Sequence, residues 1–171
     1  MTSSKKRTAF LICPVLLACT SSNTWAAEPT LTVKTISESG AQQVLVAAEH
    51  EAERLHAPCA IAVVDVSGTL VAFLKMDGVR SGSPDLAIGK ARTSALLQRP
   101  SAETEANVDN GRLAFVTAGF MTLRGGVPLK ARGQVVGAVG IAGLNKDDDV
   151  TIAQAAAAAF ESLSTTQPPA H

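Results

Sequence analysis

The sequence predicts an α+β protein, in which helices flank a five-stranded antiparallel sheet within one domain. Two observations support this fold class. Short apolar segments occur in pairs that are separated by tight-turn residues, as in β-hairpins. Segments with helical periodicity stand before, between and after these pairs. Because hairpins join strands that run in opposite directions, the pattern favours an antiparallel sheet over a parallel, doubly wound one.

The first helix is predicted over 37–56, where apolar side chains recur at three- and four-residue steps and polar ones lie opposite. β-branched residues then predict a strand over 60–66. Ser67 and Gly68 follow this strand, and glycine supplies the positive φ that a tight turn requires. A second strand over 69–76 therefore completes the first hairpin.

A second helix is predicted from Ser83 to about Gln98. Ser83 can cap its start, Pro84 suits the first helical position, and Asp85 favours the positive end of the helix dipole. A short polar helix over 103–109 is expected to follow.

The C-terminal half is predicted to add three strands and a helix. Aromatic and apolar residues indicate a strand near 117–123. A second hairpin follows Gly125, turns at 131–133 and returns along 134–143. Three acidic residues at 147–149 then open a final helix that ends near Leu163.

The strand over 134–143 has two different faces, since successive side chains point in opposite directions. One face is bulky, whereas the other carries only Ala138, Gly140 and Ala142. A face of such small residues lets a backbone, a helix or a flat ligand approach closely, and we expect helix packing.

The N-terminus has the order of a secretory signal. Three cations at 5–7 precede an apolar run over 9–19 and a polar stretch over 20–24. The apolar run is shorter than the roughly 20 residues that a membrane-spanning helix needs. Cleavage after Ala26 is the preferred interpretation, and we expect a periplasmic or secreted protein without a transmembrane segment.

A second interpretation of this signal remains open. Residues 16–19 resemble a bacterial lipobox, which would leave Cys19 as a lipidated N-terminus and anchor the protein to a membrane. With cleavage after Ala26, the chain divides into four parts: a signal peptide over 1–26, a linker over 27–36, the folded domain over 37–164 and a disordered tail over 165–171.

Charge and cysteine content narrow the function classes. Without the three cations of the signal, the formal charge falls from zero to −3, which argues against binding of nucleic acid through its phosphates. Cys59 is the one cysteine that follows the signal, so an internal disulfide is excluded in the released protein. We expect Cys59 to be a small buried hydrophobe, although a reactive thiol is the alternative.

Five short motifs occur in an order and at spacings that resemble the GlcG/HbpS family of heme-binding proteins, and the C-terminal domain of PduO-type proteins is similar. They lie at 61–68, 76–78, 89–91, 125–128 and 133–143. The resemblance extends from about Ser37 to Phe160. It implies a profilin/PAS-like domain with a five-stranded antiparallel sheet, assembly into homo-oligomers, and noncovalent binding of heme or a related tetrapyrrole.

A heme site needs an axial ligand, a flat apolar slot and cations for the propionates. The sequence contains no tyrosine and no Cys-x-x-Cys-His motif, so it excludes tyrosinate ligation and covalent attachment of the c type. The residue types leave these candidates: ligands His50, His56, Met76 and Met121, and cations Lys75, Arg80, Lys90 and Arg92.

Among these candidates His50 is preferred as the iron ligand. It lies one helical turn after Val46 on the more polar flank of the first helix, where a crevice or a subunit interface could receive a cofactor. The alternative for each histidine is a solvated helix residue, and for His56 also a favourable place at the helix C-terminus. The alternative for the four cations is ordinary surface charge.

The functional hypothesis is therefore an exported protein that sequesters or senses heme without covalent attachment. The alternative is a heme-independent module that senses a small metabolite or binds a partner, and turnover of the tetrapyrrole is a third, weaker hypothesis. The residues do not support a paired-carboxylate mechanism, so a non-enzymatic role is preferred and enzymatic activity stays open. Asp65 and Asp77 are interpreted as turn residues, and there is no Gly-x-Ser-x-Gly motif.

Overall fold

The computed structural model describes residues 29–166, so the predicted signal peptide and residues 167–171 lie outside the described part. Residues 29–32 contain no helix or strand. The elements from Val33 onward follow one another as α1 (Glu38–Arg54), β1 (Ala60–Asp65), β2 (Leu70–Lys75), α2 (Ser83–Leu97), α3 (Ser101–Asp109), α4 (Ala114–Thr117), β3 (Gly126–Ala131), β4 (Gln134–Ala142) and α5 (Lys146–Thr166). None of the helices in residues 29–166 is long and apolar enough to span a membrane.

Local sequence signals account for most of these boundaries. Ser37 precedes α1, and its hydroxyl accepts a hydrogen bond from the Gly40 amide at 3.1 Å, which caps the helix. α2 begins at Ser83 with Pro84 in its first turn, as predicted. Its cap position is Gly82, however, so the prediction that Ser83 caps the helix is wrong. Ser83 is instead the first helical residue and is buried.

The strands form one antiparallel sheet in the order β2-β1-β4-β3. The two hairpins are confirmed, since β1 pairs with β2 and β3 pairs with β4. β1 and β4 join the hairpins at the centre of the sheet, with Ile61 opposite Ile141 and Val63 opposite Val139. The α+β class and the antiparallel arrangement are thus confirmed, but the sheet in the described chain has four strands and not five.

The predicted strand near 117–123 is wrong. The segment begins in the short helix α4 and continues as an irregular stretch in which Gly119 has a φ of +80°. Two of its amides donate hydrogen bonds to groups outside the sheet. The Phe120 amide donates to the Phe115 carbonyl at 3.1 Å, and the Met121 amide donates to the Thr93 hydroxyl at 2.9 Å. Met121, one of the apolar residues that suggested a strand, also packs against Gly89 and holds this segment against α2.

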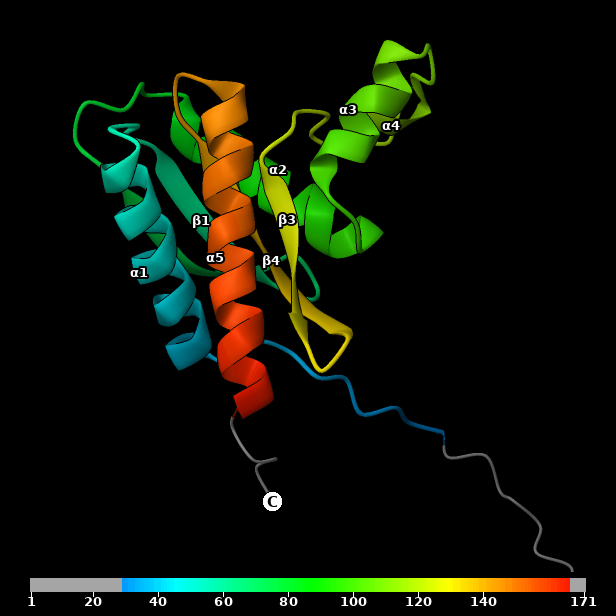
Figure 1. Cartoon of the computed structure of the whole chain (residues 1–171). Helices are drawn as coiled ribbons and strands as arrows, with labels where there is room; N and C mark the ends of the chain where they lie inside the picture. The colour runs from blue at the N-terminus through cyan, green and yellow to red at the C-terminus, as the bar shows by residue number, and fades with distance from the viewer. Residues whose placement is uncertain (1–28, 167–171) are drawn as a thin grey trace, which may run out of the picture. The chain divides into compact units, whose positions relative to one another are not determined.

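The sheet separates two helical layers, as Figure 1 shows. α1 and α5 lie together on one face, and α2 lies on the other. Large aliphatic side chains fill the layer between the sheet and the α1–α5 pair: Val44, Leu45, Ile61, Val63, Leu129, Val139, Ile141 and Ile152. The layer under α2 consists almost entirely of alanines, from β1, α2 and β4.

The small face of β4 serves for helix packing, as expected. A Cβ atom at Gly140 would lie 2.1 Å from the Ala87 carbonyl oxygen of α2, and one at Gly126 would lie 2.2 Å from the Lys90 carbonyl oxygen. α2 therefore sits so close to the sheet that these two positions have room only for glycine.

The last helix is longer than predicted. α5 continues to Thr166, so the first two residues of the predicted disordered tail are helical. The hydroxyls of Thr165 and Thr166 donate to the Ser162 carbonyl at 2.8 and 2.9 Å, which occupies a main-chain acceptor that the helix end leaves open.

Candidate functional site

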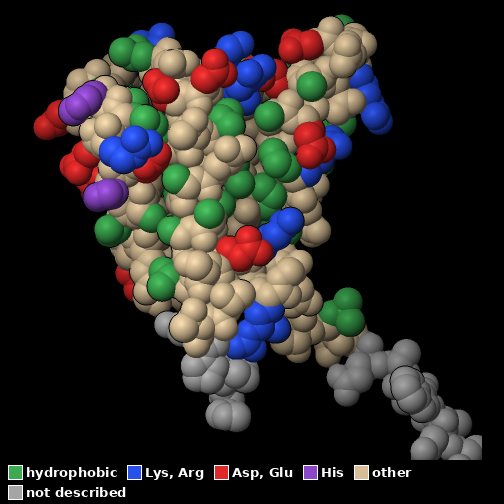
Figure 2. Space-filling view, in the orientation of Figure 1, with side chains coloured by type: hydrophobic (Ala, Val, Ile, Leu, Met, Phe, Trp, Pro, Cys, Tyr) green, Lys and Arg blue, Asp and Glu red, His purple; other side chains and the backbone are tan. Residues whose placement is uncertain are grey.

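An apolar groove of about 660 Å³ runs between α1 and α5. Its α1 wall is formed by Gln42, Gln43, Val46, Ala47, His50 and Glu51, and its α5 wall by Ala155, Ala159 and Leu163. Figure 2 views the molecule from this side and shows histidines at the α1 edge and hydrophobic side chains gathered beside them. The volume lies within the range of about 300–1,000 Å³ that is typical of small-molecule and cofactor sites.

Helical periodicity positions these side chains. Val46 and His50 are four residues apart on α1 and therefore project from the same face. Ala155, Ala159 and Leu163 repeat the same step on α5. Val46 is 65% exposed and Leu163 is 46% exposed, so two aliphatic side chains border the groove without being covered. His50 is exposed at its edge.

One ion pair borders the groove next to His50. Arg54 donates from Nε and Nη2 to the two carboxylate oxygens of Glu51, at 2.8 and 2.6 Å. This hydrogen bonding is the main cause that lowers the pKa of Glu51, while burial opposes it and the charges of Arg54 and His50 add to it. Glu51 is therefore an ionised but already paired carboxylate at neutral pH.

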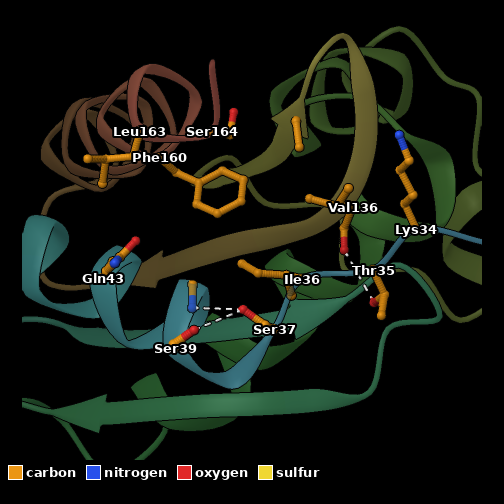
Figure 3. Close-up of a pocket in the computed structure, with 12 residues that line it drawn as sticks. Lys34, Thr35, Ile36, Ser37, Ser39, Gln43, Val136, Phe160, Leu163 and Ser164 are labelled. Carbon is orange, nitrogen blue, oxygen red and sulfur yellow. Dashed lines mark hydrogen bonds between the residues drawn. The ribbon is translucent and has the colours of Figure 1, made fainter. Parts of the chain in front are cut away.

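A second pocket of about 320 Å³ continues from the groove toward the start of α1, and the two share Gln43 and Leu163. Figure 3 shows that the Phe160 ring points from α5 toward Ile36 and Val136. These three side chains form the apolar side of the second pocket. Its polar lining includes the hydroxyls of Ser37, Ser39 and Ser164. The groove thus changes from apolar at His50 to polar beyond Gln43.

The structure distributes the other predicted candidates over different regions. His56 is exposed just after α1, has a φ of 54°, and lines a separate pocket of about 110 Å³. Lys75 ends β2 and is exposed, whereas Met76 is half-buried and packs against the core under α1. Arg80 is exposed and donates to the Gly143 carbonyl at 3.2 Å. None of these four residues lines the His50 groove.

Lys90 and Arg92 lie on α2, on the opposite face of the sheet from the groove. Lys90 is only 3% exposed, and its ammonium donates to the Asp149 carboxylate at 2.7 Å and to the Ile141 carbonyl at 2.8 Å. Arg92 is exposed and lines a cleft that also contains Met121. The structure therefore brings Arg92 and Met121 together and separates both from His50.

Asp149 is the charged partner that sequence reasoning missed. We interpreted it only as one of three acids that begin a helix, but it is 4% exposed and also accepts from the Gly143 amide at 2.6 Å. The signal was present, because Asp149 precedes the buried residues Ile152, Ala153 and Ala156 by three, four and seven positions. That spacing puts its carboxylate on the buried face of α5.

Two interpretations of single residues are confirmed. Cys59 is completely buried, and burial together with the nearby Asp149 carboxylate raises the pKa of its thiol to about 12. Asp65 is a turn former, since its carboxylate accepts from the amides of Ser67 and Thr69 at 2.8 and 2.9 Å. Burial acts to raise the pKa of Asp65, but the hydrogen bonds of the turn outweigh it and lower the pKa. The described residues contain no group of three or more metal-binding side chains.

The fold and the groove define a small α+β domain with helices on both faces of a four-stranded sheet and one histidine at an apolar groove. A protein-family model described as "Haem degrading protein HbpS-like" matches residues 36–158. This chain belongs to the HbpS-like family.

Individual proteins of known sequence or structure agree with this assignment. The chain is 41% identical to Protein GlcG of Escherichia coli K12 over 107 residues, which is 62% of this chain and 80% of GlcG. A crystal structure of a PduOC:heme complex has a TM-score of 0.67 at 28% identity, and covers 73% of this chain and 94% of that one. The structure of a double mutant of Streptomyces reticuli HbpS has a TM-score of 0.71 at 25% identity. That match covers 90% of this chain and 97% of the HbpS chain.

Proposed function

We propose that this protein binds heme without covalent attachment, in the groove between α1 and α5, and that His50 is the axial ligand of the iron. The observation that carries the proposal is an exposed imidazole at the edge of an otherwise mainly apolar groove. An imidazole is a common axial ligand of heme iron, and an apolar wall suits the flat macrocycle. Bound heme would supply the redox and ligand chemistry of its iron, while the protein holds and orients it.

The residues of the groove fit such a ligand on two counts. The side chains of Ala155 and Ala159 are small, so a flat ring can lie close to α5. Val46 and Leu163 provide aliphatic contact. The His50 imidazole is exposed at the edge of the groove, so a metal can reach its ring nitrogens.

The polar end of the groove suits the propionates. Gln43 lies seven residues before His50, which is about 10 Å along an α-helix. This length is similar to the reach of a heme from its iron to its propionates. The Gln42 and Gln43 amides and the hydroxyl-lined pocket beyond them can donate hydrogen bonds to carboxylates there. The four predicted cations are not needed for this arrangement.

The relatives support the choice of ligand. The family is described as haem-degrading, and one related domain was crystallised as a heme complex. We propose binding, with sequestration or sensing as its purpose, as the function of this chain. Export to the periplasm or the cell exterior is part of the proposal, since the N-terminal signal would place the protein where it meets free heme.

Titration of the purified protein with hemin tests the proposal. A saturable shift of the Soret band near one heme per chain is expected, and size-exclusion chromatography with light scattering would report the expected homo-oligomer at the same time. Absence of a saturable shift would refute heme binding.

Two histidine variants locate the ligand. His50→Ala should change the Soret band and weaken binding, whereas His56→Ala should leave both unchanged, because His56 is also exposed near the end of α1 but lies outside the groove. Val46→Asp places a charge against the macrocycle and should weaken binding without touching the iron ligand. If His56→Ala alone alters the band, the site lies at the C-terminal end of α1 instead.

A further inference from the structure

A second cleft, of about 520 Å³, lies on the other face of the sheet between α2 and the segment 118–122. Three kinds of residue line it: the cation Arg92, the polar Thr93, and the apolar Leu96, Phe120 and Met121. It shares no lining residue with the α1–α5 groove. The heme proposal does not use this cleft.

The wall opposite α2 is fixed in place by specific contacts. The Met121 amide donates to the Thr93 hydroxyl, and the Met121 side chain fills the space that Gly89 leaves open. A Cβ atom at Gly89 would lie 3.1 Å from both Cβ and Cε of Met121, so this methionine is packed against α2. Because the segment is held at its centre, the cleft exists before any ligand enters.

Arg92 supplies the single charge among the described lining residues. Its Nε donates to the Gly68 carbonyl at 3.1 Å, and this bond orients the guanidinium without neutralising it. Within residues 29–166, Arg92 takes part in none of the ion pairs. Its two terminal nitrogens can therefore bind a carboxylate with a bidentate geometry.

An apolar surface accompanies this cation. Leu96 follows Arg92 by one helical turn and is 52% exposed, and Phe120 and Met121 face it across the cleft. A ligand with an anionic head and an apolar body would match both the cation and this apolar surface.

We propose that the cleft between α2 and residues 118–122 is a binding site for a small organic acid, in which Arg92 holds the carboxylate and Leu96, Phe120 and Met121 contact an aromatic or branched apolar body. A tetrapyrrole fits less well, because the described residues that line the cleft include no histidine to bind heme iron. Packing of Met121 against Gly89 also commits its side chain to the wall.

Nuclear magnetic resonance on the full chain tests this site, with 3-phenylpropionate as the probe. Saturable amide shifts are expected at Gly89, Thr93, Leu96, Gly119 and Met121, with no comparable shifts at Val46 or His50. The neutral 3-phenylpropionamide and the ringless propionate should each bind at least about tenfold more weakly, since each lacks one of the two matched parts.

Three variants complete the test. Arg92→Gln should weaken binding of 3-phenylpropionate at least about tenfold. Arg80→Gln is the matched control, because Arg80 is also an exposed arginine that donates to one main-chain carbonyl but lies outside the cleft. Leu96→Glu changes an exposed position, so it should leave the fold intact while its carboxylate repels the ligand.

Three outcomes would overturn the proposal. They are no saturable shifts up to about 10 mM probe, equal binding of acid and amide, or binding that both Arg92→Gln and Leu96→Glu leave unchanged. Hemin titration of Arg92→Gln separates this site from the heme proposal, since heme binding should persist in that variant. If hemin binding is lost in Arg92→Gln and kept in His50→Ala, the cleft is the tetrapyrrole site and both assignments are wrong.

Discussion

Among single residues, Lys90 illustrates how burial decides the role of a charge. From sequence it is a candidate partner for a propionate or an ordinary surface charge, whereas the structure pairs it with Asp149 beneath α2, next to the carbonyl of Ile141. Both side chains are at most 5% exposed, and each has a further main-chain partner. The pair therefore ties α2, α5 and the end of β4 together.

Loss of one partner of this pair is expected to be costly. Lys90→Met keeps most of the unbranched side chain but leaves a buried carboxylate without its cation, so the free energy of unfolding should fall by about 3–5 kcal/mol. Urea denaturation followed by circular dichroism measures the change.

The exposed pair of Arg54 and Glu51 provides the control. Arg54→Met should cost far less than Lys90→Met, because the Arg54 side chain is 58% exposed and water screens its interaction with Glu51. Equal losses in the two variants would contradict the structural role of Lys90. The double variant Lys90→Met with Asp149→Asn should recover part of the loss, since no uncompensated charge remains.

At the scale of elements, the sheet depends on how closely α2 can approach it. Alanines from β1, β4 and α2 form the interface. Gly126 of β3 and Gly140 of β4 have no Cβ atom that would overlap the main chain of α2. Such an interface buries little apolar area per residue, so its stability relies on close contact between main chains.

Gly140→Ala is expected to destabilise the protein through this contact. The added methyl group would overlap the Ala87 carbonyl and force α2 away from the sheet, at a cost of about 1–3 kcal/mol or more. Thermal unfolding should show a lower midpoint. Gly82→Ala is the matched control, since a Cβ atom there meets nothing within 4 Å and its φ is −81°. Similar midpoints for the two variants would mean that α2 has room to shift.

The segment near 117–123 shows why one element was predicted wrongly. Its apolar residues are compatible with a strand by local pattern, but an amide becomes part of a sheet only when a partner strand offers a carbonyl. Here Thr93 on α2 and Phe115 in α4 supply the acceptors. Pattern reasoning has no access to the Thr93 acceptor, because packing between distant segments brings it to Met121.

For the whole molecule, the proposed export makes a prediction about the N-terminus. Cleavage after Ala26 should give a released protein that starts at Ala27, which mass spectrometry of the periplasmic or secreted fraction would detect. The competing lipobox interpretation predicts an acylated Cys19, partition into detergent and incorporation of labelled fatty acid. A chain that retains Met1 in the cytoplasm would contradict both.

The distribution of sites is also a property of the whole molecule. His50 and Arg92 were predicted to serve one heme, yet α1 and α2 lie on opposite faces of the sheet. The heme groove and the acid-binding cleft that we propose are therefore separate, and each can be altered without the other. This separation makes the histidine and arginine variants informative about different ligands.

Sequence alone was sufficient for the features that depend on neighbouring residues. Periodicity and turn chemistry predicted eight of the elements to within a few residues, the two antiparallel hairpins and the small face of β4, and the ordered motifs led to the HbpS-like family. Such features follow from backbone preferences and the alternation of side chains, which are local.

Only the tertiary structure decided which faces meet. The pairing of β1 with β4, the burial of Lys90 against Asp149, the groove beside His50 and the cleft beside Arg92 all join residues that are far apart in the chain. The physical reason is that several stackings of the same elements satisfy their local preferences. The close contact of α2 with Gly126 and Gly140 and the aliphatic layer under α1 and α5 select one of them.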